Sequence, residues 1–304
     1  MAALQDTVKI ALDELRMQML GVQVLFGFQF HGVFQEEFDT LSRQAKLADA
    51  AALSLLVLTL GLLIAAPSQH RLVEHGEATR RILRVSARFA NIALAPFAVA
   101  IGCDMFVVLE RFLGSQTALG IAAAVAAAAF LLLYGLGEAL RPFVSKSDLE
   151  NAVPQQTKTD LHHKIEQLLT ESRVILPGAQ ALLGFQLVVT MTGSFAKLAP
   201  VDRAIHFSAL VAVAVAVMML LTPAAVHRIA FDGRDTQRFH AIGSAIVTLA
   251  LIPVALGIAL DFYVAAFKML GDKAVAAVGA GVAGAFLIAL WFALPLALRH
   301  GHQG

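Results

Sequence analysis

An internal repeat with a fixed offset of 157 residues most limits how this chain can fold. "GVQVLFGFQ" begins at Gly21 and "GAQALLGFQ" begins at Gly178, and six of the nine positions are identical. The same offset aligns further pairs along the chain, among them Glu14 with Glu171, Arg16 with Arg173, His70-Arg71 with His227-Arg228, Pro96 with Pro253, and Asp104 with Asp261. A register held over this length predicts two structurally equivalent halves.

Both halves contain apolar stretches long enough to cross a lipid bilayer. Hydrophobic residues make up 58% of the 304 residues and charged residues only 15%, whereas about a quarter of a soluble domain is charged. A helix needs about 20 apolar residues to cross the bilayer. We therefore predict eight spans, at residues 17–35, 47–66, 86–109, 116–140, 174–194, 203–222, 239–264 and 273–297.

The even number of spans in each half determines how the halves are related. Both halves enter the membrane from the same side, which predicts a parallel repeat with a pseudo-two-fold axis along the membrane normal. The predicted fold is an all-α integral membrane protein. Its predicted parts are a first four-helix repeat (1–140), a cytoplasmic linker (141–165) and a second four-helix repeat (166–304).

The distribution of Lys and Arg predicts the orientation of the chain in the membrane. With the N-terminus inside, sixteen of the 23 Lys and Arg residues fall in the inner segments. Inner segments of membrane proteins carry an excess of these residues. We therefore expect both termini on the cytoplasmic side.

Two glutamines lie in the first span and two in the fifth. They are Gln23 and Gln29 in the first half, and Gln180 and Gln186 in the second. Amide groups in a bilayer core need hydrogen-bonding partners. They can hold helices together where glycines allow a close approach, or they can line a polar path between the halves. Both interpretations place the first and fifth spans against each other.

Asp104 and Asp261 are the strongest candidates for a functional site. An ionisable residue within a span is costly, and it marks a functional-site hypothesis. Each aspartate follows a proline by eight residues, Pro96 or Pro253, and such a proline can kink a helix. His31 is expected at a similar depth to Asp104 and could exchange a proton with it. The alternative is that these side chains lie at the interface and reach water.

Charged residues at the inner ends of the spans predict an ion-pair layer or a cytoplasmic gate. His70-Arg71 and His227-Arg228 follow a proline near the end of the second and sixth spans. They are expected to bind lipid headgroups or helix-end carbonyl groups. The predicted layer also contains Glu14, Arg16, Glu171 and Arg173.

Several function classes have no motif in this chain. There is no G-x-x-x-x-G-K-[ST] sequence for nucleotide binding, no H-E-x-x-H sequence, no cysteine cluster and no nucleophile signature. A net charge of +1 gives no basic face for nucleic acid. We therefore expect no enzymatic activity, no metal site, no cofactor and no nucleic-acid partner.

The motifs of the second half resemble those of a bacterial family of short, four-helix membrane proteins of undetermined function. They are E-x-R at Glu171, G-x-Q-x-L-x-G-F at Gly178, P-x-x-x-H-R at Pro223 and W-F-A-L-P at Trp291. The first half is more divergent and lacks the W-F-A-L-P sequence. Some members of that family carry the label sodium:proton antiporter. The resemblance implies a tandem duplication located in the bacterial cytoplasmic (inner) membrane.

Two functions follow from these features. The first is conduction or exchange of protons or monovalent cations, with Asp104 and Asp261 as relays, the four glutamines as lining and the path between the halves. The second is a scaffold or accessory subunit in which glycine and glutamine serve only helix packing. The expected partners are the lipid bilayer, protons or monovalent cations, and either another copy of the chain or another membrane subunit.

Overall fold

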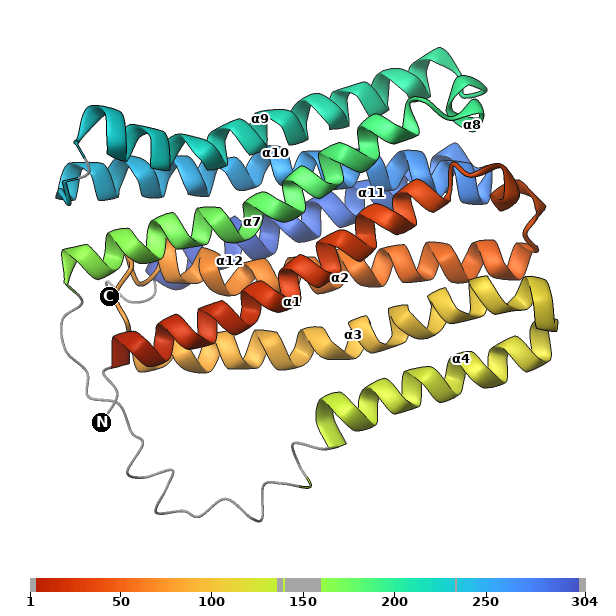
Figure 1. The fold of residues 1–304 in the computed structure, drawn as a ribbon, viewed down its shortest axis with the longest axis horizontal. Helices are drawn as coiled ribbons and strands as arrows, with labels where there is room; N and C mark the ends of the chain where they lie inside the picture. Colours follow the sequence, from red (N-terminus) through yellow and green to blue (C-terminus); the bar gives the residue numbers. More distant parts are fainter. Residues whose placement is uncertain (1–3, 136–138, 140–159, 233, 301–304) are drawn as a thin grey trace.

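A computed structural model describes residues 4–135, 139, 160–232 and 234–300, and the regular elements in these residues are all helical (Figure 1). Most of the predicted linker 141–165 lies outside the described residues. The predicted fourth span is described as far as Gly135. The elements of the first half are α1 (Leu4–Gly32), the 3₁₀-helix η1 (Glu36–Thr40), α2 (Arg43–Leu72), α3 (Arg80–Leu113), α4 (Ser115–Phe130) and the π-helical segment η2 (Leu131–Gly135).

The second half repeats this order of elements. It consists of α7 (Leu161–Val189), α8 (Gly193–Ala196), α9 (Pro200–Ala230), α10 (Gln237–Leu270), α11 (Lys273–Ile288), the π-helical segment η4 (Ala289–Ala293) and α12 (Leu294–His300). α7 and α10 begin and end 157 residues after α1 and α3. The N-caps of α3 and α10 are also equivalent, because Thr79 and Thr236 each accept a hydrogen bond from the amide three residues on. The sequence repeat is therefore also a repeat of local structure.

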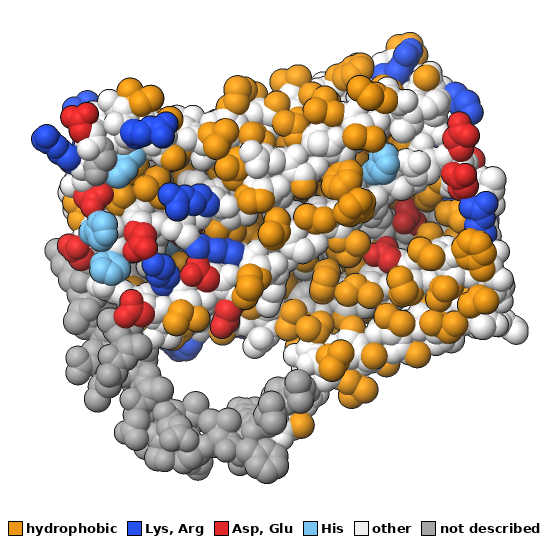
Figure 2. Space-filling view, in the orientation of Figure 1, with side chains coloured by type: hydrophobic (Ala, Val, Ile, Leu, Met, Phe, Trp, Pro, Cys, Tyr) orange, Lys and Arg blue, Asp and Glu red, His pale blue; other side chains and the backbone are white. Residues whose placement is uncertain are grey.

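Seven helices of the described chain are long and apolar enough to cross a membrane. Four of them begin at Arg43, Arg80, Leu161 and Pro200, and the others begin at Ser115, Gln237 and Lys273. α1 is not among them. Figure 2 shows charged side chains gathered toward the two ends of the molecule, with a broad apolar surface between them. The structure is thus that of a multi-pass membrane protein.

The helices of each half pack in the same way. α1 lies against α2 and α3, and α7 lies against α9 and α10. In each half the second and third long helices pair along their length, and the fourth packs on the third. Figure 1 shows α1 and α7 crossing obliquely over the other long helices.

The contacts between the halves are not reciprocal, so the predicted pseudo-two-fold axis is not confirmed. α2 of the first half packs against α10, α11 and α12 of the second. A two-fold axis would require α9 to pack against α3 and α4 in the same way, and these pairs are absent from the principal helix contacts of the described residues. The two halves are therefore arranged head-to-tail, so that unlike surfaces of the two repeats are in contact.

A small residue on α2 accounts for part of this asymmetry. Gly61 leaves room for the Phe286 ring of α11, and its carbonyl accepts a hydrogen bond of 3.0 Å from Trp291 Nε1. The equivalent residue on α9 is Met218, whose side chain is exposed. A bulky methionine cannot provide the same close approach.

Candidate functional site

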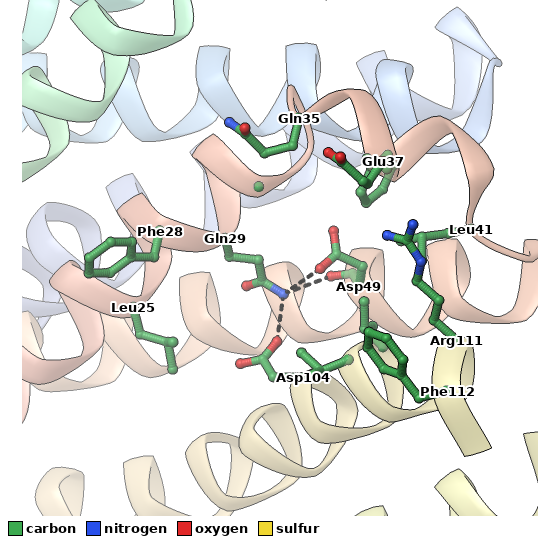
Figure 3. A pocket seen from close by; sticks show the side chains of 14 residues that line it. Leu25, Phe28, Gln29, Gln35, Glu37, Leu41, Asp49, Asp104, Arg111 and Phe112 are labelled. Atoms are coloured by element: carbon green, nitrogen blue, oxygen red, sulfur yellow. Dashed lines mark hydrogen bonds between the residues drawn. The ribbon is translucent and has the colours of Figure 1, made fainter. Parts of the chain in front are cut away.

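The amide of Gln29 joins two carboxylates from neighbouring helices (Figure 3). Gln29 Nε2 on α1 donates to Asp104 Oδ1 on α3 at 3.0 Å and to Asp49 Oδ1 on α2 at 3.2 Å. It also lies 3.1 Å from the backbone oxygen of Asp49. Two acidic side chains therefore share one amide nitrogen, and three helices of the first half position them.

The second half contains the equivalent site with one residue changed. Gln186 Nε2 donates to Asp261 Oδ2 at 2.6 Å, as Gln29 does to Asp104. The residue equivalent to Asp49 is His206. Its Nε2 atom lies 3.1 Å from the backbone oxygen of Gln186, and its Nδ1 atom lies 3.4 Å from Asp261 Oδ1.

This substitution changes the charge of the site. A carbonyl oxygen only accepts hydrogen bonds, so the contact with Gln186 assigns a proton to His206 Nε2. The Nδ1 atom faces the Asp261 carboxyl group, so this site contains one imidazole ring and one carboxyl group. The first-half site contains two carboxyl groups in the equivalent positions, and Arg111 lines the cavity beside them.

The first-half site leaves buried oxygen atoms without protein partners. Gln29 is 8% exposed and Asp49 is 7% exposed. Within the described residues, no hydrogen bond reaches Gln29 Oε1, Asp49 Oδ2 or Asp104 Oδ2, although all three atoms are buried. A buried polar group without a partner is costly, and such a group requires an explanation.

A cavity of about 400 Å³ adjoins these atoms. Gln29, Asp49 and Asp104 line it, and so do Glu37 and Arg111. Figure 2 shows acidic side chains in a recess within the apolar surface. Every residue that lines the cavity belongs to the first half, so the site lies within one repeat and not between the repeats as we expected.

The second-half site is closed. Gln186, His206 and Asp261 are all 0% exposed. The rings of Phe30 and Phe195 lie 5.7 Å and 5.0 Å from the His206 ring, centroid to centroid. The two sites thus share a geometry but differ in charge and accessibility.

The contact between the halves at Gln23 is nearly dry. Gln23 is buried, and its side chain packs directly against Gly178 of α7. The cavity beside them has a volume of about 10 Å³, which is too small to hold a chain of water molecules. Gln180 is exposed. The two repeated glutamines of each half therefore differ: Gln29 and Gln186 each bind an aspartate, whereas Gln23 serves packing.

The proton exchange predicted for His31 and the helix kinks predicted at Pro96 and Pro253 stay predictions, and the structure gives the surroundings of these residues. His31 Nε2 lies 2.8 Å from Gln35 Nε2, and no hydrogen bond within the described residues joins His31 to Asp104. Pro96 and Pro253 lie inside α3 and α10, and both helices continue past them. Neither proline interrupts the helix that carries its aspartate.

The inner surface brings together only part of the predicted ion-pair layer. Glu171 of α7 contacts Arg71 Nη1 at 2.6 Å and His70 Nδ1 at 3.0 Å on α2, and all three side chains are buried. Arg16 pairs with Asp13, and His227 lies 3.4 Å from Asp235. The remaining members of the predicted layer, Glu14, Arg173 and Arg228, are exposed.

Asp49 and His206 are the site residues that sequence reasoning missed. Both lie near the start of a predicted span, and the two residues are not identical. A comparison that keeps only identical repeat pairs therefore omits them. The signal that could have found them is the 157-residue offset itself, which aligns one ionisable residue with another.

Comparison with known proteins identifies the family. A family model described as "Family of unknown function (DUF6328)" matches residues 6–137 and again residues 155–295. No curated protein and no solved structure matches the chain. Among the described residues, no group of three or more His, Cys, Asp or Glu side chains is gathered for a metal ion. The chain therefore belongs to the DUF6328 family of unknown function and contains two copies of its domain.

Proposed function

We propose that this protein conducts or exchanges protons or monovalent cations at the first-half site formed by Gln29, Asp49 and Asp104. The observation that carries the proposal is the meeting of two carboxylates at one amide nitrogen, beside a cavity of about 400 Å³ and three unpartnered buried oxygens. Ionisable groups in membrane spans commonly mark ion pathways or proton relays.

The chemistry of the site favours a small cation or a proton as the bound species. Two buried negative charges in contact are costly unless a positive charge accompanies them. Carboxylate and amide oxygens are hard ligands that suit hard cations. A proton on one carboxyl group, or a monovalent cation at the free oxygens, would neutralise the pair in part.

The second half supports this assignment by contrast. There His206 replaces the second carboxylate and pairs with Asp261. The second-half site therefore holds one carboxyl group where the first-half site holds two. The proposed function therefore assigns ion exchange to the first half and a structural role to the closed site of the second half.

The proposal includes eight membrane spans, with both termini in the cytoplasm of a bacterial cell. α1 is counted as a span because its repeat counterpart α7 is apolar and long enough to cross the membrane. The excess of Lys and Arg in the inner segments supports this orientation. The cavity at Asp104 then lies toward the outer surface.

Proton flux in proteoliposomes tests the proposal. A pH-sensitive dye trapped inside the vesicles reports flux under an imposed pH gradient and then under a sodium or a potassium gradient. We expect Asp104→Asn to reduce the flux at least tenfold. Its matched control is Asp261→Asn at the equivalent position, and it should retain most of the flux once purified in folded form.

A further variant converts the first site into a copy of the second. Asp49→His places an imidazole opposite Asp104, as His206 lies opposite Asp261. We expect this variant to lose flux while remaining folded, since the same triad is already stable in the second half. Equal flux in the wild type, Asp104→Asn and Asp49→His under every gradient would refute the assignment of the site.

The dry contact between the halves favours a second candidate function. Gln23 and Gly178 pack closely beside a cavity of about 10 Å³, as expected for a scaffold or an accessory subunit. Flux no faster than that of empty vesicles, across all three gradients, would support this function in place of ion exchange.

A further inference from the structure

The first helix of each half carries two stripes of residues that face in different directions. The first stripe consists of Glu14, Gly21 and Phe28 in α1, and of Glu171, Gly178 and Phe185 in α7. Residues seven apart lie on one face of a helix. The second stripe consists of Gln23 and Gly27 in α1, and of Gln180 and Gly184 in α7. It lies about 120° to 160° around the helix from the first.

The contact between the halves uses one stripe from each helix. The second stripe of α1 packs against the first stripe of α7: Gln23 lies against Gly178, and Gly27 lies against the Phe185 ring. At the inner end, Glu171 of the same α7 stripe binds His70 and Arg71 of α2. Gln23 and Gly27 are buried, as are Glu171 and Gly178.

The other stripe of each helix is more exposed within the described residues, although the Phe28 ring of α1 lies 4.6 Å from the Phe185 ring, centroid to centroid. In α1, Glu14 and Gly21 are exposed, and Phe28 is 58% exposed. In α7, Gln180 and Gly184 are exposed. A Cβ atom added at Gly21 or Gly184 would meet nothing within 4 Å. His227 and Arg228, the repeat equivalents of His70 and Arg71, form no contact with Glu14 among those described.

We propose that a second copy of this chain occupies these faces, with its Glu14–Gly21–Phe28 stripe packed against the Gln180–Gly184 stripe of the first copy. Each residue of the free pair of stripes is the repeat equivalent of a residue in the contact between the halves. Gln180 would lie against Gly21 of the neighbour, Gly184 against its Phe28, and Arg228 near its Glu14. The halves already show that this contact packs well.

The physical reason for such a contact is strongest at Gln180. An amide within a span that faces lipid has no hydrogen-bonding partner. Glycine on a neighbouring helix allows the backbone to come close enough to accept from an amide, and small residues favour helix association in membranes. A head-to-tail contact is heterologous, so it leads to a closed ring or to an open array. The close contact that Gly61 allows between the halves would not recur between copies, because Met218 stands at the repeat-equivalent position.

Cysteine cross-linking in native membranes tests this interface. The only cysteine, Cys103, is first replaced by alanine. Two variants are then co-expressed with different tags: one carries Gly21→Cys and the other carries Gln180→Cys. We expect an oxidant to produce a disulfide-linked species with both tags, in up to about half of the chains, which is the most that random mixing of two variants in equal amounts allows. A single chain with both Gly21→Cys and Gln180→Cys should give a ladder of covalent oligomers.

Three controls make every outcome informative. Gln23→Cys with Gly178→Cys should form its disulfide within one chain, which shows that the reaction reaches this depth in a folded protein. Gly21→Cys with Leu256→Cys on the exposed face of α10 should not cross-link. Gly21→Cys expressed alone should stay monomeric.

Two results would overturn the proposal. Cross-linking of Gly21→Cys to itself would show a symmetric dimer in place of the head-to-tail contact. Absence of any link between the stripes, while the intrachain control reacts fully, would show that lipid or a different protein covers both faces. Neither result depends on ion flux, so failure of this proposal is distinct from failure of the proposed function.

Discussion

Replacement of Glu171 by glutamine provides a direct test of what holds the two halves together. Glu171 Oε2 lies 2.6 Å from Arg71 Nη1, Oε1 lies 3.0 Å from His70 Nδ1, and the Glu171 and Arg71 side chains are each 4% exposed. Glu171→Gln keeps the shape but leaves the Arg71 charge buried without its counter-ion. Removal of one partner of a buried ion pair costs about 3–5 kcal/mol. The unfolding constant should therefore rise by roughly a hundredfold to a few thousandfold.

The free energy of unfolding in mixed detergent micelles measures this effect, with detergent in large excess so that each micelle holds one chain. Glu14→Gln is the matched control, because Glu14 is the repeat equivalent of Glu171 and is exposed. It should change the free energy of unfolding by less than about 0.5 kcal/mol, as expected for a surface substitution. If the two variants unfold at the same denaturant concentration, the Glu171 pairing does not stabilise the fold and the reasoning fails.

Three further substitutions, one of them a control, test contacts within and between the halves by the same unfolding assay. Trp291→Phe removes the hydrogen bond to the Gly61 carbonyl and should lower the free energy of unfolding by about 1–3 kcal/mol. The control is Tyr134→Phe at the repeat-equivalent and more exposed position, which should lower it by less than about 1 kcal/mol. Equal effects of the two substitutions would contradict the assigned role of Trp291. Gln186→Leu removes the donor to buried Asp261 and should cost about 1.5–3 kcal/mol, and an unchanged stability would show that Asp261 is satisfied without Gln186.

The repeat and the helices could be predicted from the sequence because both depend on local and periodic features. The 157-residue offset predicts that α7 and α10 begin at positions equivalent to the starts of α1 and α3, and the N-cap Thr79 of α3 recurs as Thr236 of α10. Apolar length predicts the long helices. The importance of Gln29 and Asp104 also follows from the sequence, because polar residues in an apolar span need partners.

The relation between the halves could not be predicted in the same way. An even number of spans gives two parallel halves, but a two-fold axis and a head-to-tail order are both compatible with it. The choice depends on how side chains fit at residues such as Gly61 and Met218, which only the packed helices reveal. The partner of Gln29 on α2, Asp49, was missed for a similar reason, since its equivalent is a histidine.

A tandem duplication permits an asymmetry that identical subunits cannot have. If four-helix subunits assembled as separate chains, every copy would carry the same residue at the position of Asp49 and His206. With both copies in one chain, one site can keep two carboxylates beside a cavity while the other is closed by an imidazole. The closed site can then be optimised for stability, because Gln186, His206 and Asp261 are fully buried. Both sites hold buried polar atoms without hydrogen-bonding partners among the described residues, but only those of the open site adjoin a cavity of about 400 Å³. The fusion therefore separates the stabilising role of the Gln–Asp pair from its proposed role in ion exchange.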